Sequence, residues 1–168
     1  RAVANRTVRA MIEHAWDKSA RAWRALYANG TYRAVRHVVD TIYTSRVAPL
    51  LDSDVRGGMR RLAAEELVVG RGRDWQWVRA LSLNDSEASW PGTRRPDHGT
   101  TGAYAAWPAL LAESLAKLGG AEGWDDSEGA ALSLLRGAAA AADDGPYGQA
   151  HELYGGYSGP PDPLFGDD

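Results

Sequence analysis

The sequence predicts an all-α domain of helical hairpins that form part of a toroid, with long functional loops at one end. Three observations predict this class. About five segments repeat apolar residues at helical spacing. The links between them alternate between short ones and long ones rich in Trp, His, Asp and Glu. The chain has 168 residues, of which 44% are hydrophobic, so we expect a single domain over residues 1–168 with a core of its own.

The first half of the chain alternates helical and extended patterns. Residues 4–16 have a helical period, after which the pattern is extended as far as the turn pair Asn29-Gly30. The helical period returns over residues 32–44 and is broken by Pro49. Asp52 or Ser53 can cap a further helix that continues to about residue 67.

The second half begins with a long connection over residues 70–106, whose one apolar insert covers residues 75–83. Connections of this length are uncommon in compact domains unless they carry function. Trp107-Pro108 is typical of a helix start, and Gly119-Gly120 is typical of a helix end. A last helix is expected from Ser127 to about residue 142. Everything after it is expected to be loop, ending in an irregular tail over residues 155–168.

Composition excludes several classes of protein. The absence of cysteine excludes disulfides and thiolate chemistry, and no apolar run approaches the ~20 residues of a membrane span. The net charge of −3 gives no electrostatic reason to expect nucleic acid or anionic lipid. The four histidines lack the spacing of zinc ligands. We therefore expect no nucleic acid, membrane, metal or cofactor. The compartment stays open, with the cytoplasm favoured.

Residues 145–154, Gly-Pro-Tyr-Gly-Gln-Ala-His-Glu-Leu-Tyr, hold the densest group of candidate site residues. The aromatic rings suit the apolar faces of sugars, and the amide of Gln149 suits hydroxyl groups. Glu152 lies next to His151 and two residues before Tyr154, which can orient it and tune its acidity. The alternative is a loop glutamate that bonds backbone amides or water.

Two further groups suit sugar binding. Asp97-His98 and Tyr104 precede Trp107 in a glycine-rich segment, where the backbone can approach a ligand. Trp107 can instead be a buried staple at its helix start. Trp75 and Trp77 precede Arg79 and would share one face of a strand, as a stacking platform or as part of the core. Asp85 and Glu87 follow and are expected to be solvated; the alternative is that one of them is a substrate-binding carboxylate.

Three of these segments resemble bacterial six-hairpin glycosidases with an (α/α)6 toroid, the clan of trehalases, processing α-glucosidases and glycogen-debranching-like enzymes. Pro49-Leu50-Leu51 resembles the clan's link between hairpins, and the segment from Gly102 to Trp107-Pro108 resembles its Gly-x-x-Trp-Pro helix entry. Glu152-Leu153-Tyr154 resembles the Glu-x-Tyr element near the end of such domains. The clan's Trp-Asp general-acid element has no convincing copy upstream of Glu152.

The resemblance implies the C-terminal portion of an inverting glycoside hydrolase acting on a glucoside-like substrate. Glu152 would be the general base, and the general acid would lie outside these residues, with another chain or an N-terminal portion completing the toroid. The implied sugar-binding residues are Trp77, Arg79, Asp97, His98, Tyr104, Trp107, Gln149 and His151. The alternatives are a non-catalytic helical-hairpin domain that binds sugar or protein, and a biosynthetic enzyme that reuses the toroid.

Overall fold

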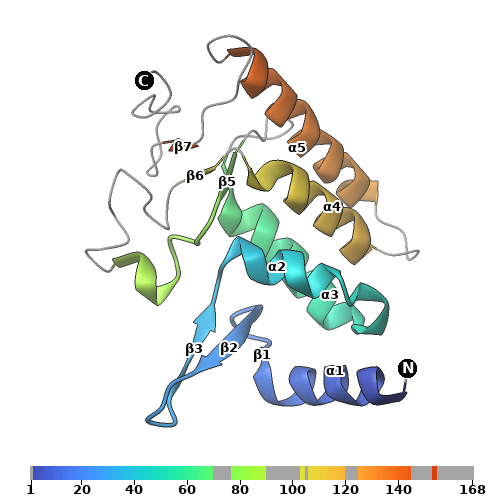
Figure 1. The fold of residues 1–168 in the computed structure, drawn as a ribbon, viewed down its shortest axis with the longest axis vertical. Coiled ribbons are helices and arrows are strands. Elements are labelled where there is room, and N and C mark those ends of the chain that lie inside the picture. Colours follow the sequence, from blue (N-terminus) through green and yellow to red (C-terminus); the bar gives the residue numbers. More distant parts are fainter. Residues whose placement is uncertain are drawn as a thin grey trace.

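The protein has a mixed α/β fold, so the prediction of an all-α domain is wrong. The computed structural model describes residues 2–69, 77–89, 103–104, 106–119, 125–144 and 153–154. Within them lie five α-helices and two small antiparallel sheets, one of three strands and one of four (Figure 1). The strands are two to five residues long. Segments this short show little of the two-residue period that reveals a strand in a sequence.

The N-terminal part consists of one helix and the three-stranded sheet. Its elements are α1 (Ala2–Ala15), β1 (Trp16–Asp17), β2 (Ala22–Leu26) and β3 (Tyr32–Val35). The predicted helix over residues 4–16 and the extended pattern after it are confirmed. Gly30 has a φ of +82°, which glycine adopts without strain, and closes the turn between β2 and β3. The predicted helix over residues 32–44 is wrong in its first part, because that part is β3.

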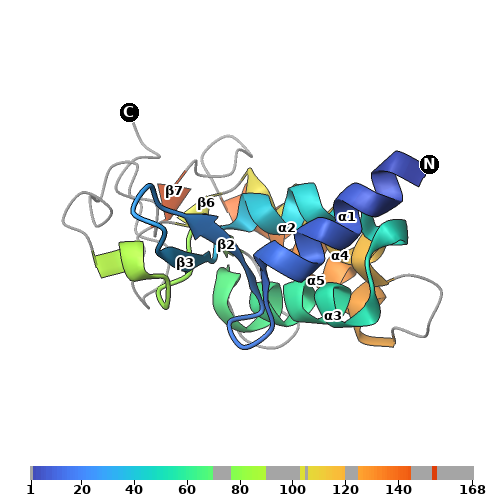
Figure 2. The ribbon, with the colours of Figure 1, turned by 90° about the horizontal axis from the view of Figure 1, so that it is seen from below.

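Four helices lie beside one another and form the body of the molecule (Figures 1 and 2). They are α2 (Val38–Ser45), α3 (Ser53–Leu62), α4 (Trp107–Gly119) and α5 (Asp125–Asp144). The 3-10 turn η1 (Ala48–Leu50) joins α2 to α3. As predicted, Asp52 caps α3, its Oδ1 accepting a hydrogen bond of 2.9 Å from the Val55 amide. None of the helices in the described ranges is both long and apolar enough to cross a membrane.

The main core lies between α4 and the helices around it. α4 packs against α2, α3 and α5. Its buried leucines meet apolar side chains of the other helices, and Trp16 of β1 and Ala22 of β2 add to the same cluster. The fully buried residues of this core include Val38, Val55, Met59, Leu62, Leu67, Val78, Leu111, Leu115, Leu118 and Leu134. The core therefore fixes β1 and β2 against the helical body.

The second sheet collects strands from distant parts of the chain. α3 continues into a π-helical turn, η2 (Ala63–Leu67), which leads into β4 (Val68–Val69). The other strands are β5 (Trp77–Arg79), β6 (Ala103–Tyr104) and β7 (Leu153–Tyr154), all antiparallel in the order β4-β5-β6-β7. The prediction that only loop follows the last helix is wrong at β7. The predicted irregular tail over residues 155–168 lies outside the described residues.

The two sheets are joined where β3 ends and where the chain leaves β5. His37 and Leu81 form an antiparallel bridge. The Val38 amide donates to the Ala80 carbonyl at 2.9 Å, and the Ser82 amide donates to the Arg36 carbonyl at 3.0 Å. The chain then passes into a 3-10 turn, η3 (Ser86–Ser89). The segment that follows β5 is thus held by backbone hydrogen bonds to the start of α2.

Candidate functional site

Four of the predicted site residues lie in the described part of the chain. Trp77 and Arg79 are on β5, Tyr104 is on β6, and Trp107 is the first residue of α4. The remaining five lie outside the described residues: Asp97, His98, Gln149, His151 and Glu152.

The second sheet brings together the three segments in which sequence reasoning placed a sugar site. Val78 lies opposite Tyr104, and Arg79 lies opposite Ala103. Ala103 in turn lies opposite Tyr154. Glu152 directly precedes β7 in the sequence. Segments separated by dozens of residues in the chain are therefore neighbours in one sheet.

The register divides these side chains between the two faces of the sheet. Directly opposite residues of an antiparallel pair share a face, and consecutive residues alternate. Trp77, Arg79 and Ala103 therefore occupy one face, which we call the outer face because Val78 of the main core lies on the other side of the sheet. Tyr104 shares the other face with Val78, which belongs to the main core. Sequence reasoning had assigned Tyr104, Trp77 and Arg79 alike to sugar binding, and it had no means of knowing this register.

Burial decides what the outer face can contribute. Trp77 is only 6% exposed and packs against Ala103 and Val69, so its ring helps to hold the sheet together. Arg79 is half-buried, and burial lowers the pKa of its guanidinium from the ordinary value. A partly desolvated guanidinium forms stronger hydrogen bonds to acceptors than one in water. On this face, Arg79 is the described residue best suited to bind hydroxyl or carboxyl oxygens.

Trp107 is placed differently from the other candidates. It is half-buried and packs against the main core, and its indole nitrogen is buried without a hydrogen-bond acceptor among the described residues. A side chain in this position anchors the start of α4. The staple interpretation of Trp107 therefore agrees with its packing.

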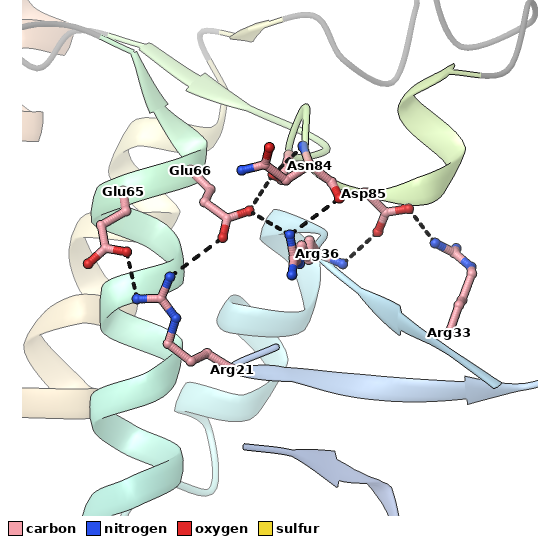
Figure 3. A network of polar contacts seen from close by, with 8 residues as sticks. Arg21, Arg33, Arg36, Glu65, Glu66, Asn84 and Asp85 are labelled. Carbon is pink, nitrogen blue, oxygen red and sulfur yellow. Dashed lines mark hydrogen bonds and ion pairs between the residues drawn. The ribbon is translucent and has the colours of Figure 1, made fainter. Parts of the chain in front are cut away.

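A cluster of charged side chains surrounds the junction between the two sheets (Figure 3). Both carboxylate oxygens of Asp85 are engaged: Oδ1 pairs with the Arg33 guanidinium at 2.5 Å, and Oδ2 accepts from the Arg36 amide at 2.8 Å. The Arg36 guanidinium lies 3.4 Å from Glu66, which also accepts a hydrogen bond of 2.5 Å from the Ser82 hydroxyl. We call these five residues the junction cluster.

Arg21 extends the junction cluster to the neighbouring acid on η2. Its guanidinium pairs with Glu65 at 2.6 Å and lies 3.7 Å from Glu66. Both acids belong to the π-helical turn that follows α3. Such turns change which side chains face inward, and they occur frequently at functional sites. Here the turn leaves the Glu66 side chain 8% exposed and the Glu65 side chain 53% exposed.

The expectation that Asp85 is solvated is wrong, because its side chain is completely buried. Sequence reasoning missed this residue because the four polar residues 84–87 give no sign of which one turns inward. The partners come from β3 and from the first residue after it, far from Asp85 in the sequence. A possible signal was the charged Arg33 and Arg36 among the apolar residues of that segment, since buried arginines require acidic partners.

Asp40 lies in the first turn of α2, near the junction cluster. Burial raises the pKa of its carboxyl, while His37 and Arg33 act in the opposite direction. Its Oδ2 is buried and has no hydrogen-bond partner among the described residues. Asp40 therefore destabilises the folded state when it is ionised.

The junction cluster has a structural role, because its ion pairs and hydrogen bonds connect segments of the fold. The carboxylates of Asp85 and Glu66 are held by arginines and hydroxyl or amide donors, which leaves them poorly placed to exchange protons with a substrate. Among the described residues, no group of three or more His, Cys, Asp or Glu could hold a metal ion.

Comparisons of the chain with protein-family models, curated proteins and solved structures found no match.

Proposed function

We propose that this protein is carbohydrate-active and forms part of an inverting glycoside hydrolase that acts on a glucoside-like substrate. One observation carries the proposal. The pairing of β5, β6 and β7 joins the tryptophan-arginine segment, the glycine-rich segment before α4 and the segment that contains Glu152. These are the three segments whose residue types suit a sugar site. Their convergence supports one site at this sheet.

The outer face would supply recognition. Arg79 can donate several hydrogen bonds in a fixed fork to sugar oxygens. Trp77, two residues earlier on the same face, would lie beside Arg79 as a buried part of the sheet. Asp97, His98, Gln149 and His151 are proposed to bind sugar hydroxyls on the basis of their residue types alone.

Glu152 would act as the general base. In an inverting mechanism the base removes a proton from the water that attacks the anomeric carbon, while an acid about 6.5–9.5 Å away protonates the leaving oxygen. Glu66 and Asp85 are unsuited to be that acid, because ion pairs with arginines and hydrogen bonds from other donors occupy both carboxylates. As the clan resemblance implies, the general acid is proposed to come from outside these 168 residues.

The proposal is tested with the intact protein, a panel of aryl glucosides and glucose-containing disaccharides, and the substitution Glu152→Gln. We expect Glu152→Gln to lower the turnover rate by a factor of about 10² or more. Sugar binding measured by calorimetry should persist in this variant. Glu113→Gln is the matched control, since it makes the same chemical change at an exposed pair on α4. Unchanged turnover in Glu152→Gln would refute the role of Glu152. Failure of the wild-type protein to bind any sugar would refute carbohydrate activity altogether.

A non-catalytic sugar- or protein-binding domain is the second candidate. It is favoured by one observation: the buried carboxylates of Asp85 and Glu66 serve the fold through ion pairs. Such a domain would bind sugars in calorimetry without hydrolysing them, and Arg79→Ala would weaken that binding. A biosynthetic enzyme would also bind sugars without hydrolysis, but it would turn over a glycosyl donor and an acceptor together.

A further inference from the structure

Asp85 lies outside the proposed sugar site. It is nevertheless hydrogen-bonded to the segment that follows Arg79, a residue of that site. Arg79 is the last residue of β5, and Ala80 follows it directly. From Ala80 onward the chain no longer lies in the second sheet and is held by the bridge between His37 and Leu81. The position of Arg79 therefore depends on how firmly this continuation is fixed.

Two backbone hydrogen bonds fix the continuation, one on each side of the bridge. They run from the Val38 amide to the Ala80 carbonyl and from the Ser82 amide to the Arg36 carbonyl. Antiparallel pairing over so few residues contributes little by itself, because short two-stranded contacts are marginal in water. Additional interactions must hold the register.

Asp85 supplies these interactions from the far end of the same segment. Its own amide donates to the Ser82 carbonyl at 3.1 Å, which closes a turn. Its carboxylate then forms an ion pair with Arg33 of β3 and accepts a hydrogen bond from the amide of Arg36, the residue after β3. The turn and these two carboxylate contacts together hold Ser82 against Arg36, in the register that places Ala80 beside Val38. Because the side chain of Asp85 is fully buried, water cannot replace these contacts.

We propose that Asp85 is a positioning residue, which fixes the register of Ala80–Ser82 on Arg36–Val38 and thereby the place of Arg79 on the outer face. This inference rests on the proposed sugar site for its functional consequence, while the register itself does not depend on it. The junction cluster then has a role in recognition without contacting the ligand.

The first experiment measures the register directly. In Asp85→Asn the ion pair with Arg33 is lost while the shape of the side chain is kept. We expect amide hydrogen exchange of Val38 and Ser82 to become faster by about tenfold or more. Glu113→Gln, the same chemical change at an exposed pair, should leave both rates unchanged. Equal exchange rates in Asp85→Asn and wild type overturn the proposal, whether or not the protein binds sugar.

The second experiment asks whether the effect on sugar affinity passes through Arg79. Sugar affinity is compared in Asp85→Asn, Arg79→Ala and the double variant. Each single change should weaken binding by about tenfold, and the double variant should be no weaker than Arg79→Ala alone. Independent losses that multiply to about a hundredfold would show that Asp85 acts without Arg79 and would overturn the proposal.

The outcomes separate this inference from the proposed function. A wild-type protein that binds no sugar removes the sugar site, and the exchange rates still decide whether Asp85 fixes the register. If Asp85→Asn does not fold, Arg33→Met removes the same ion pair from its less buried side and carries both measurements. Normal exchange at Val38 and Ser82 in Arg33→Met would then overturn the proposal.

Discussion

Replacing Gly58 by alanine tests the packing between α3 and the first sheet. A Cβ at this position would lie 2.6 Å from Cζ2 of Trp16 and 3.1 Å from its Cη2. Trp16 is 5% exposed and packs edge-to-face against Trp23, with ring centroids 5.1 Å apart, so its ring has little room to move. Such overpacking costs about 1–3 kcal/mol. The helix propensity of alanine offsets roughly 1 kcal/mol of this cost.

Gly57→Ala is the matched control, because it makes the same change one residue earlier in α3. Its Cβ would meet only the end of the Arg60 side chain, at 3.5 Å. We therefore expect Gly57→Ala to stabilise the protein by about 0.5–1 kcal/mol. Gly58→Ala should be less stable than Gly57→Ala by about 1–3 kcal/mol.

The assay is thermal and urea unfolding followed by circular dichroism, with the free energy of unfolding compared between the two variants. Each kcal/mol corresponds to about 2–4 °C in Tm for a chain of this size. Equal stability of Gly57→Ala and Gly58→Ala would refute the reasoning. It would mean that the Trp16 ring can shift to accept the added Cβ at little cost in stability, so that it does not pack tightly against α3.

Three further changes test the polar interactions of the core and the helix ends. Trp23→Phe removes the 2.7 Å hydrogen bond to the Thr44 hydroxyl and should cost about 1–3 kcal/mol in urea unfolding, since that hydroxyl is left buried. Asp52→Ala removes the cap on the Val55 amide and should cost about 1 kcal/mol in the same assay. Asp40→Asn should stabilise the protein at pH 7. The pKa of Asp40 is raised in the folded state, so the folded protein loses stability as the pH rises from the ordinary value of 3.8 to the raised value. The stability gained by Asp40→Asn should therefore disappear in thermal melts below pH 3.8. A gain that persists there would contradict the assignment.

The helices could be predicted from the sequence because each one carries its own signals. α3 has a capping aspartate and an apolar face in ten consecutive residues, and α4 has Trp107-Pro108 at its start. These signals are local, so they do not depend on what packs against the helix.

The strands could not be predicted equally well, since they depend on partners far away in the sequence. β6 and β7 have two residues each, and only their pairing with each other and with β5 makes them strands. β3 was hidden because Val35, Val38, Val39 and Ile42 continue a helical period across the junction between a strand and a helix. The Asn29-Gly30 turn, with β2 before it, is the signal that could have revealed β3 as the second strand of a hairpin.

The candidate site follows the same division. Residue types alone singled out Trp77, Arg79 and Tyr104, and the structure places all three in one sheet. The face on which each side chain lies depends on the pairing register, and a one-residue shift of the register moves every side chain to the other face. Tyr104 is for this reason on the face opposite Arg79. The burial of Asp85 likewise arises from the meeting of two distant segments.

The strand order of the second sheet also has a consequence for how the protein folds. The turn between β2 and β3 closes within a few residues, and such hairpins form in about 1–10 μs. By contrast, β6 and β7 are separated in the chain by α4 and α5, which pack against each other in the fold. Closing a long loop for a two-residue strand costs chain entropy that its own contacts repay poorly. We therefore expect the second sheet to be completed last, and the strand that follows Glu152 to be the first element lost when the protein begins to unfold.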